Sequence, residues 1–120
     1  ASNTAKRDAA NMVRAAFQLT NASIEHGDGY PGWLPNKNSE ILHITETAYK
    51  KLFNTTSAVK AIHAGLECGL FLEKYPDLDM ISFGPTIRGA HSPDERLEIS
   101  TVQKFWDLLV EVLKNIATEK

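Results

Sequence analysis

Helical and extended patterns alternate along the chain after residue 38, and this alternation constrains the fold more than any other feature. Apolar residues recur at three- and four-residue steps, which predicts helices over 39–53, 66–74 and 101–117. Short apolar runs between them predict strands over 59–63 and 79–83. This order favours an α/β fold in which strands are sandwiched between helices.

The segment from Gly27 to Asn36 is the clearest break in the chain, with three glycines and two prolines in ten residues. An amphipathic helix is predicted before it over 3–20, followed by a short strand over 22–26. We interpret the break as a domain boundary. The alternative is a long loop within one domain, and in either case Tyr30 and Trp33 are expected to bury their rings and pin the crossover.

The last predicted helix has the strongest pattern. Its apolar stripe, which we expect to face the core, consists of Val102, Phe105, Trp106, Leu109, Leu113 and Ile116. Ser100 and Gln103 have the spacing of a capping box at its start. Earlier in the chain, Ser2 or Asn3 and Asn38 or Ser39 are candidate N-caps, and Asn54 is a candidate helix end.

Composition excludes several classes of function. The formal net charge of −2 argues against a nucleic-acid partner, and the apolar runs fall short of the roughly 20 residues of a membrane span. The single cysteine, Cys68, cannot form an intrachain disulfide, which fits a reducing compartment. The chain opens without Met and enters a helix almost at once, as a truncated piece would.

The glycine- and proline-rich loop over 83–96 carries the main candidate for chemistry, His91. Gly89 and Ala90 leave little bulk beside its ring, and Asp94 and Glu95 lie close enough to bias it electrostatically. A neutral imidazole on a loop anchored between a strand and a helix is suited to binding zinc. The alternative is a surface turn with an incidental histidine.

A second unusual stretch, from Ile62 to Leu70, passes from a strand into a helix through small residues. The turn at Ala64 and Gly65 would direct backbone N–H groups at an anion such as a substrate carboxylate, and Glu67 is a further substrate-facing candidate. Because ligands of open α/β sheets bind at the carboxyl ends of strands, this turn and His91 are expected to meet. The alternatives are tight glycine packing, a surface Glu67 and, for Cys68, a small buried hydrophobe rather than a nucleophile.

These motifs together resemble one family. Tyr30-Pro31-Gly32-Trp33, the run Ile62 to Phe71, Gly84-Pro85-Thr86-Ile87 and His91-Ser92-Pro93-Asp94-Glu95 closely resemble, in order, the C-terminal part of aminoacyl-histidine dipeptidases. These enzymes, also called Xaa-His dipeptidases or peptidase D, are co-catalytic zinc peptidases related to carnosinase and carboxypeptidase G. The resemblance covers nearly the whole chain.

The resemblance implies a domain organisation and a site. Residues 1–28 would end an inserted lid and dimerisation domain, 29–36 would form the crossover, and 37–120 would be the C-terminal part of the catalytic domain. His91 matches the last zinc ligand of the family. Glu67 stands where most relatives carry an aspartate, which puts its role in doubt, and the remaining ligands and the general base belong to the N-terminal part.

The implied function is hydrolysis of Xaa-His dipeptides by water activated on two zinc ions, in a cytoplasmic enzyme that is a homodimer when intact. No catalytic residue of the family falls within the chain, so the 120 residues alone are expected to be inactive. Two alternatives remain at this stage. One is a non-enzymatic binding or dimerisation module, and the other is a related zinc hydrolase with a different substrate.

Overall fold

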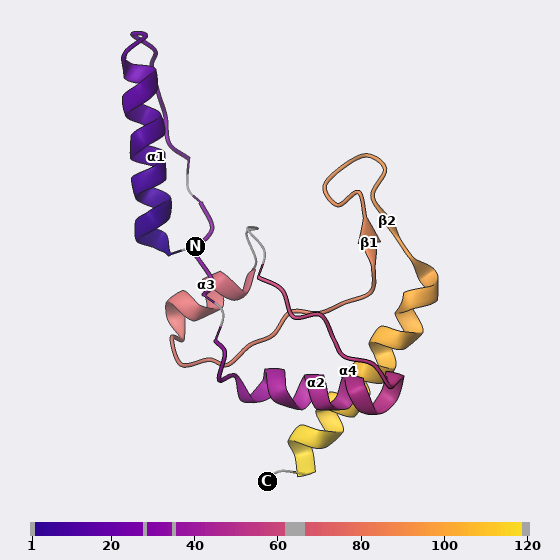
Figure 1. Cartoon of the computed structure of the whole chain (residues 1–120). Helices are drawn as coiled ribbons and strands as arrows, with labels where there is room; N and C mark the ends of the chain where they lie inside the picture. The colour runs from indigo at the N-terminus through magenta and orange to yellow at the C-terminus, as the bar shows by residue number, and fades with distance from the viewer. Residues whose placement is uncertain (1, 28, 35, 62–66, 119–120) are drawn as a thin grey trace. The chain divides into compact units, whose positions relative to one another are not determined.

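The computed structural model describes all residues except 1, 28, 35, 62–66 and 119–120 (Figure 1). Contacts divide the chain into two compact units, one formed by 1–37 with 60–78 and the other by 38–59 with 79–120. The fold is mixed α/β, rich in helix with one short sheet, and this confirms the predicted class. In the part of the chain that the structure describes, no helix is long and apolar enough to cross a bilayer.

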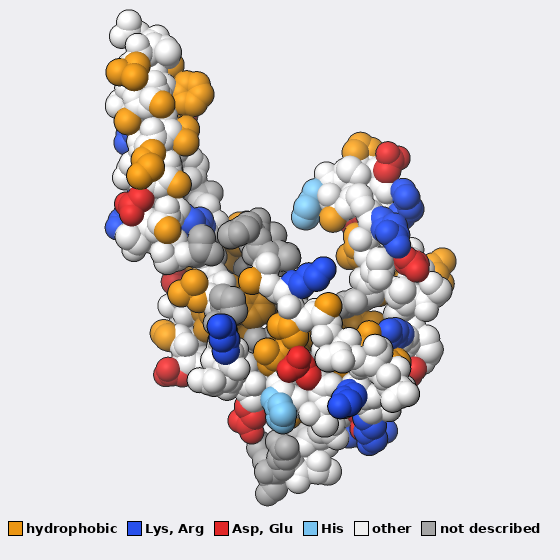
Figure 2. All heavy atoms as spheres, viewed as in Figure 1, with side chains coloured by type: hydrophobic (Ala, Val, Ile, Leu, Met, Phe, Trp, Pro, Cys, Tyr) orange, Lys and Arg blue, Asp and Glu red, His pale blue; other side chains and the backbone are white. Residues whose placement is uncertain are grey.

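The first unit contains α1 (Asn3–Gln18) and α3 (Glu67–Lys74). The predicted cap is confirmed at α1, where the Ser2 hydroxyl accepts a hydrogen bond from the Ala5 amide at 3.2 Å. No residue of α1 is buried, and Figure 2 shows hydrophobic side chains exposed along it. The amphipathic pattern therefore predicted the helix correctly, although its apolar face has no cover within the described residues.

Pro31 and Gly32, in the segment that follows α1, contact the two helices of this unit. The side chain of Asn3 accepts a hydrogen bond from the Gly32 amide at 2.7 Å. Gly69 of α3 is buried, and a Cβ added there would lie 2.5 Å from the carbonyl oxygen of Pro31, so only glycine fits. The expectation that both aromatic rings would be buried is wrong for Tyr30, which is 48% exposed, while Trp33 is half-buried.

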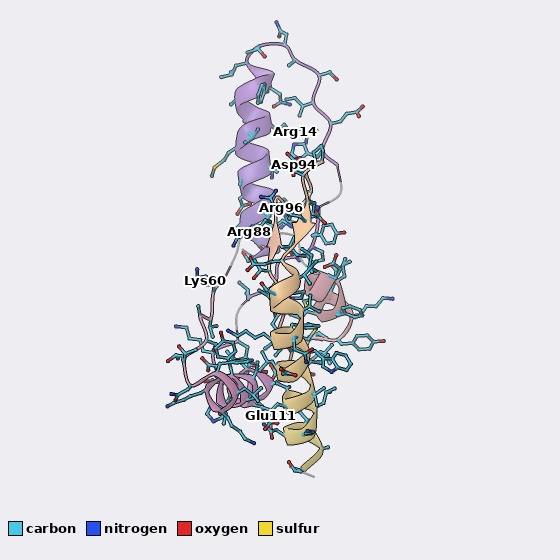
Figure 3. The ribbon with its side chains drawn as sticks, turned by 90° about the vertical axis from the view of Figure 1, so that its right-hand side faces the viewer. Arg14, Lys60, Arg88, Asp94, Arg96 and Glu111 are labelled. Atoms are coloured by element: carbon cyan, nitrogen blue, oxygen red, sulfur yellow. The ribbon has the colours of Figure 1, made fainter. Side chains whose placement is uncertain are left out.

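The second unit is built on α2 (Glu40–Phe53) packed against α4 (Val102–Thr118), which follows the short 3₁₀ turn η1 (Ile99–Thr101). The buried core consists of Ile44, Ala48, Leu108 and Val112. Lys51 of α2 forms an ion pair with Glu111 of α4 at 2.6 Å, and Figure 3 labels Glu111 at this junction. Lys104 also donates a hydrogen bond to the Tyr49 hydroxyl at 2.9 Å.

The predicted stripe of α4 is only partly correct: Ile116 packs against the core and Phe105 and Leu109 are half-buried, but its other members are exposed. Leu108 and Val112, absent from the predicted set, are the buried residues, whereas Trp106 and Leu113 are each 56% exposed. The reason is geometric: α4 has apolar residues around much of its circumference, and α2 covers only one side of it.

The predicted strands are wrong wherever the structure describes them, over 22–26, 59–61 and 79–83, and residues 62–63 lie outside the described part. A strand requires a neighbouring backbone with which to pair, and these runs pair with no other described segment. The observed sheet is instead an antiparallel hairpin of β1 (Ile87–Arg88) and β2 (Arg96–Leu97). Three of its four residues, Ile87, Arg88 and Arg96, lie within the stretch 83–96 that was predicted as loop, because two-residue strands carry no detectable periodicity.

The start of α2 is stabilised by two side chains. The predicted N-cap Ser39 accepts a hydrogen bond from the Leu42 amide at 3.1 Å, and the Asp79 carboxylate accepts one from the Ile41 amide at 3.1 Å. Partial burial raises the pKa of Asp79, but hydrogen bonds from the Ser39 hydroxyl and from backbone amides, including that of Ile41, outweigh it and hold the pKa below its usual value. The helix ends as predicted at Asn54, in the left-handed conformation with φ 50°.

Replacing Asp79 with Ala is expected to lower the free energy of unfolding by about 1 kcal/mol at pH 7, because the start of α2 loses a charged acceptor. The pKa of Asp79 is lower in the folded state, so its contribution is fully present above the unfolded pKa of about 3.9 and is lost as the pH falls through the folded pKa. Urea unfolding at pH 7 and pH 3, followed by circular dichroism, measures this change.

The exposed Asp77 provides a control, since no described residue bonds to its carboxylate. Asp77→Ala is expected to change stability by less than about 0.5 kcal/mol at either pH. An Asp79→Ala effect that is equally large at pH 3 would contradict the assignment of the effect to the ionised carboxylate.

Candidate metal-ligand loop

The hairpin of β1 and β2 presents His91 in the loop 89–95. Its strands are in register with Ile87 opposite Leu97 and Arg88 opposite Arg96. Figure 3 shows Arg88 and Arg96 on the paired strands and Asp94 further along the hairpin, in the loop. The imidazole of His91 is exposed, and none of the residues that the structure describes forms a hydrogen bond with it. A ring with free nitrogens on the surface of a short hairpin is sterically available as a ligand.

Ser92 organises the loop internally. Its amide and its hydroxyl both donate to the Gly89 carbonyl, at 3.0 and 2.7 Å. Its own carbonyl accepts from the Glu95 amide at 3.0 Å, and its hydroxyl accepts from the Asp94 amide at 3.3 Å. These local bonds explain why the sequence Gly-Ala-His-Ser-Pro-Asp-Glu closes a turn between two strands.

His91 itself has φ 64°, in the left-handed region that residues other than glycine rarely adopt. Its amide donates a hydrogen bond to the Glu95 carboxylate at 2.6 Å. The sequence predicted that Asp94 and Glu95 would act on the imidazole electrostatically. The structure instead shows the Glu95 carboxylate bonded to the main chain of His91.

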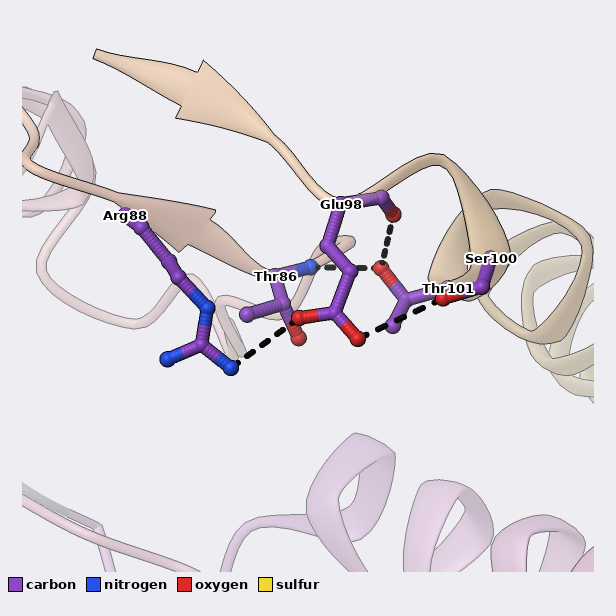
Figure 4. Close-up of polar contacts among 5 residues, drawn as sticks. All are labelled: Thr86, Arg88, Glu98, Ser100 and Thr101. Carbon is purple, nitrogen blue, oxygen red and sulfur yellow. Dashed lines mark hydrogen bonds and ion pairs between the residues drawn. The ribbon is translucent and has the colours of Figure 1, made fainter. Parts of the chain in front are cut away.

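The base of the hairpin is joined to the start of α4 through Glu98 (Figure 4). The Glu98 carboxylate forms an ion pair with Arg88 at 3.0 Å and accepts a hydrogen bond from the Ser100 hydroxyl at 3.3 Å. The Glu98 amide donates to the Thr86 carbonyl at 2.9 Å. The Thr86 amide in turn donates to the Thr101 hydroxyl, also at 2.9 Å.

This network replaces the capping box predicted from Ser100 and Gln103. The Ser100 hydroxyl bonds to Glu98, and the Gln103 amide donates to Asp107 one turn further along α4 at 2.8 Å. The capping box is therefore wrong, because the chain enters α4 through a 3₁₀ turn that alters the spacing. The sequence analysis did not identify Glu98 or Thr101. The opposite charges of Arg88 and Glu98 on either side of a turn-rich loop were the one sequence signal for their pairing.

The structure leaves the second predicted element of the site open. Glu67 is exposed and is the first residue of α3, in the first unit, whereas His91 belongs to the second. Ala64 and Gly65, with the neighbouring His63, lie outside the described residues. The expectation that the turn at 64–65 meets His91 therefore stays a prediction.

The other candidates contribute no further cluster. Cys68 is half-buried with a free thiol, and His26 and His43 are exposed. Among the residues with described positions, no three His, Cys, Asp or Glu side chains come together as a metal site. The loop over 89–95 thus offers one accessible imidazole, that of His91, which suits one ligand of a site completed by other residues.

Comparison with known proteins identifies the family of the chain. The family model described as peptidase family M20/M25/M40 matches residues 5–115, and the chain belongs to this family. Peptidases of the family depend on metal ions. The match over residues 5–115 thus places the chain in a family of metal-dependent peptidases.

Two particular relatives are dipeptidases. The chain is 48% identical over 106 residues to the cytosol non-specific dipeptidase of Escherichia coli strain K12, covering 88% of this chain and 22% of that protein. It is 44% identical to the aminoacylhistidine dipeptidase from Vibrio alginolyticus, whose crystal structure matches with a TM-score of 0.72 over 94% of this chain and 23% of that one. The chain thus spans less than a quarter of the length of either relative.

Proposed function

We propose that this chain is the C-terminal part of a zinc-dependent dipeptidase that hydrolyses Xaa-His dipeptides such as carnosine. The observation that carries the proposal is the exposed imidazole of His91 on a hairpin whose backbone is fixed by hydrogen bonds, in a chain of a peptidase family. The name of the Vibrio alginolyticus relative supports histidine as the second residue of the substrate.

In this proposal His91 holds one zinc ion through an imidazole nitrogen, and the remaining ligands and the general base come from the N-terminal part of the enzyme. When bound, zinc polarises the substrate carbonyl and lowers the pKa of a water. Ala64, Gly65 and Glu67 are proposed to seat the end of the substrate far from the scissile bond. The short side chains at 64 and 65 leave room for that approach.

The proposal includes the organisation expected from the resemblance. Residues 1–28 end a lid domain, 29–36 cross over, and 37–120 complete the catalytic domain of a cytoplasmic homodimer. The contacts divide between residues 37 and 38, which supports a boundary near this position, but they group residues 60–78 with 1–37 rather than with the rest of 38–120. The unpartnered apolar face of α1 supports packing against a segment outside the described residues.

The test compares the 120-residue chain with a full-length protein in which the N-terminal part precedes it. With zinc and carnosine, the full-length protein is expected to release histidine, to lose this activity on chelation and to regain it when zinc is restored. The isolated chain is expected to release none, since it supplies one ligand. Turnover by the isolated chain that His91→Ala abolishes would contradict the proposed division of the site.

A broader dipeptidase is the second candidate, favoured by the name of the Escherichia coli relative. A panel of dipeptides with a common first residue and varied second residues separates the two. Xaa-His specificity predicts the highest kcat/KM for histidine, whereas equal values across the panel would favour the broader enzyme. A full-length protein that hydrolyses none of them would favour a non-enzymatic module.

A further inference from the structure

The conformation of His91 requires support from another group. With φ 64°, its backbone lies in a region where the side chain of an L-residue crowds the following carbonyl. Ser92 fixes Gly89, Asp94 and Glu95 but makes none of its hydrogen bonds to His91. In the described part of the chain, the hydrogen bond that holds His91 is the one from its amide to Glu95.

The bond to Glu95 has the properties of a strong positional restraint. The distance from the His91 nitrogen to Oε2 is 2.6 Å, at the short end for an amide donor, as expected when the acceptor is a carboxylate. Glu95 directly precedes β2, and its amide is itself bonded to Ser92. Its carboxylate is therefore presented from a backbone that the hairpin has already fixed.

The restraint extends from the loop to α4. Arg88 on β1 pairs with Glu98, and Thr86 is bonded to both Glu98 and Thr101 (Figure 4). The hairpin is thereby anchored at its base, while Glu95 acts at its far end on His91. A carboxylate used in this way is directed at the main chain of the loop rather than at a metal ion.

We propose that Glu95 is a positioning residue, whose carboxylate holds the main chain of His91 in the left-handed conformation and so directs the imidazole outward toward the metal. This inference rests on the proposed role of His91 as a zinc ligand. It assigns Glu95 neither metal coordination nor proton transfer. The length of Glu95 and its acceptor oxygen position the loop, and its charge strengthens the hydrogen bond.

The test measures zinc affinity of the full-length enzyme by competition with a chromophoric chelator. Glu95→Ala is expected to weaken zinc binding by roughly 10- to 100-fold, as loss of a group that orients a ligand does. Glu95→Gln retains an acceptor oxygen at the same reach and is expected to restore most of the affinity. Asp94→Ala removes the neighbouring exposed carboxylate, which forms no hydrogen bond or ion pair with a described residue, and is expected to leave affinity unchanged.

A second measurement is independent of metal. In the ¹H–¹⁵N spectrum of the 120-residue chain, the His91 amide proton is expected downfield and to move upfield in Glu95→Ala but not in Asp94→Ala. An amide that does not respond to Glu95→Ala would overturn the proposed hydrogen bond even if that variant bound zinc poorly through misfolding.

The outcomes separate this inference from the proposed function. If His91→Ala abolishes zinc binding at one site and Glu95→Ala does not weaken it, the positioning role is wrong while the role of His91 stands. If Glu95→Ala and Asp94→Ala weaken binding equally, the effect is one of overall charge and the positioning role is again wrong. If His91→Ala leaves zinc binding unchanged, the proposed ligand is wrong, and the positioning role fails with it.

Discussion

Under the proposed function, replacing His91 with Ala in the full-length protein is expected to lower kcat/KM for an Xaa-His dipeptide by more than about 100-fold. Loss of a residue that only orients a metal ligand costs roughly 10- to 100-fold, and loss of the ligand itself should exceed this. Histidine release gives the rate, and the zinc content of the dialysed protein shows whether a metal ion has been lost.

Because His91 is exposed, its replacement is expected to leave the fold of the chain undisturbed. Its ring packs against no core residue, so His91→Ala is expected to change the free energy of unfolding by less than about 0.5 kcal/mol. His43 provides a matched control because it is an exposed histidine on α2, and His43→Ala should retain both activity and zinc. Equal activity in the two variants would remove His91 from the site.

The second large effect is expected at Leu108, where substitution by Ala should lower the free energy of unfolding by about 3 kcal/mol. Leu108 is 6% exposed and belongs to a core of four buried residues between α2 and α4. With so few buried side chains, the neighbours have little scope to close the cavity. Urea unfolding of the 120-residue chain, followed by circular dichroism at 222 nm, measures the loss.

Leu113 tests whether burial is the cause. It lies on the same helix and is 56% exposed, so Leu113→Ala is expected to cost less than about 0.5 kcal/mol. Similar losses for the two leucines would show that α4 is stabilised by its intrinsic helix propensity or by contacts on its other face. They would therefore contradict the packing described between α2 and α4.

Features encoded by neighbouring residues were predictable from the sequence. The N-caps Ser2 and Ser39 and the left-handed Asn54 were identified because a helix end is determined within one turn of chain. The four helices were found within a few residues of their bounds for the same reason. The proposal that His91 is a metal ligand came from the composition of its loop and from family motifs, neither of which requires the fold, and it stays a prediction.

Features that depend on distant partners were not predictable. Strands were expected at apolar runs such as 79–83, but a run becomes a strand only where another backbone pairs with it. Similarly, periodicity found an apolar side on α4 but could not show that Leu108 rather than Trp106 would meet α2. The contacts of Glu95 and Glu98 depend on a hairpin register that composition does not specify.

The hydrogen bonds and the ion pair that fix the hairpin of β1 and β2 have a consequence for recombination of this segment among related proteins. All of those described here lie between Thr86 and Thr101, within sixteen consecutive residues. Recombination that transfers this whole segment therefore carries the hydrogen bonds that shape the loop together with His91. A crossover between His91 and Glu95 would separate the imidazole from the carboxylates that hold its loop.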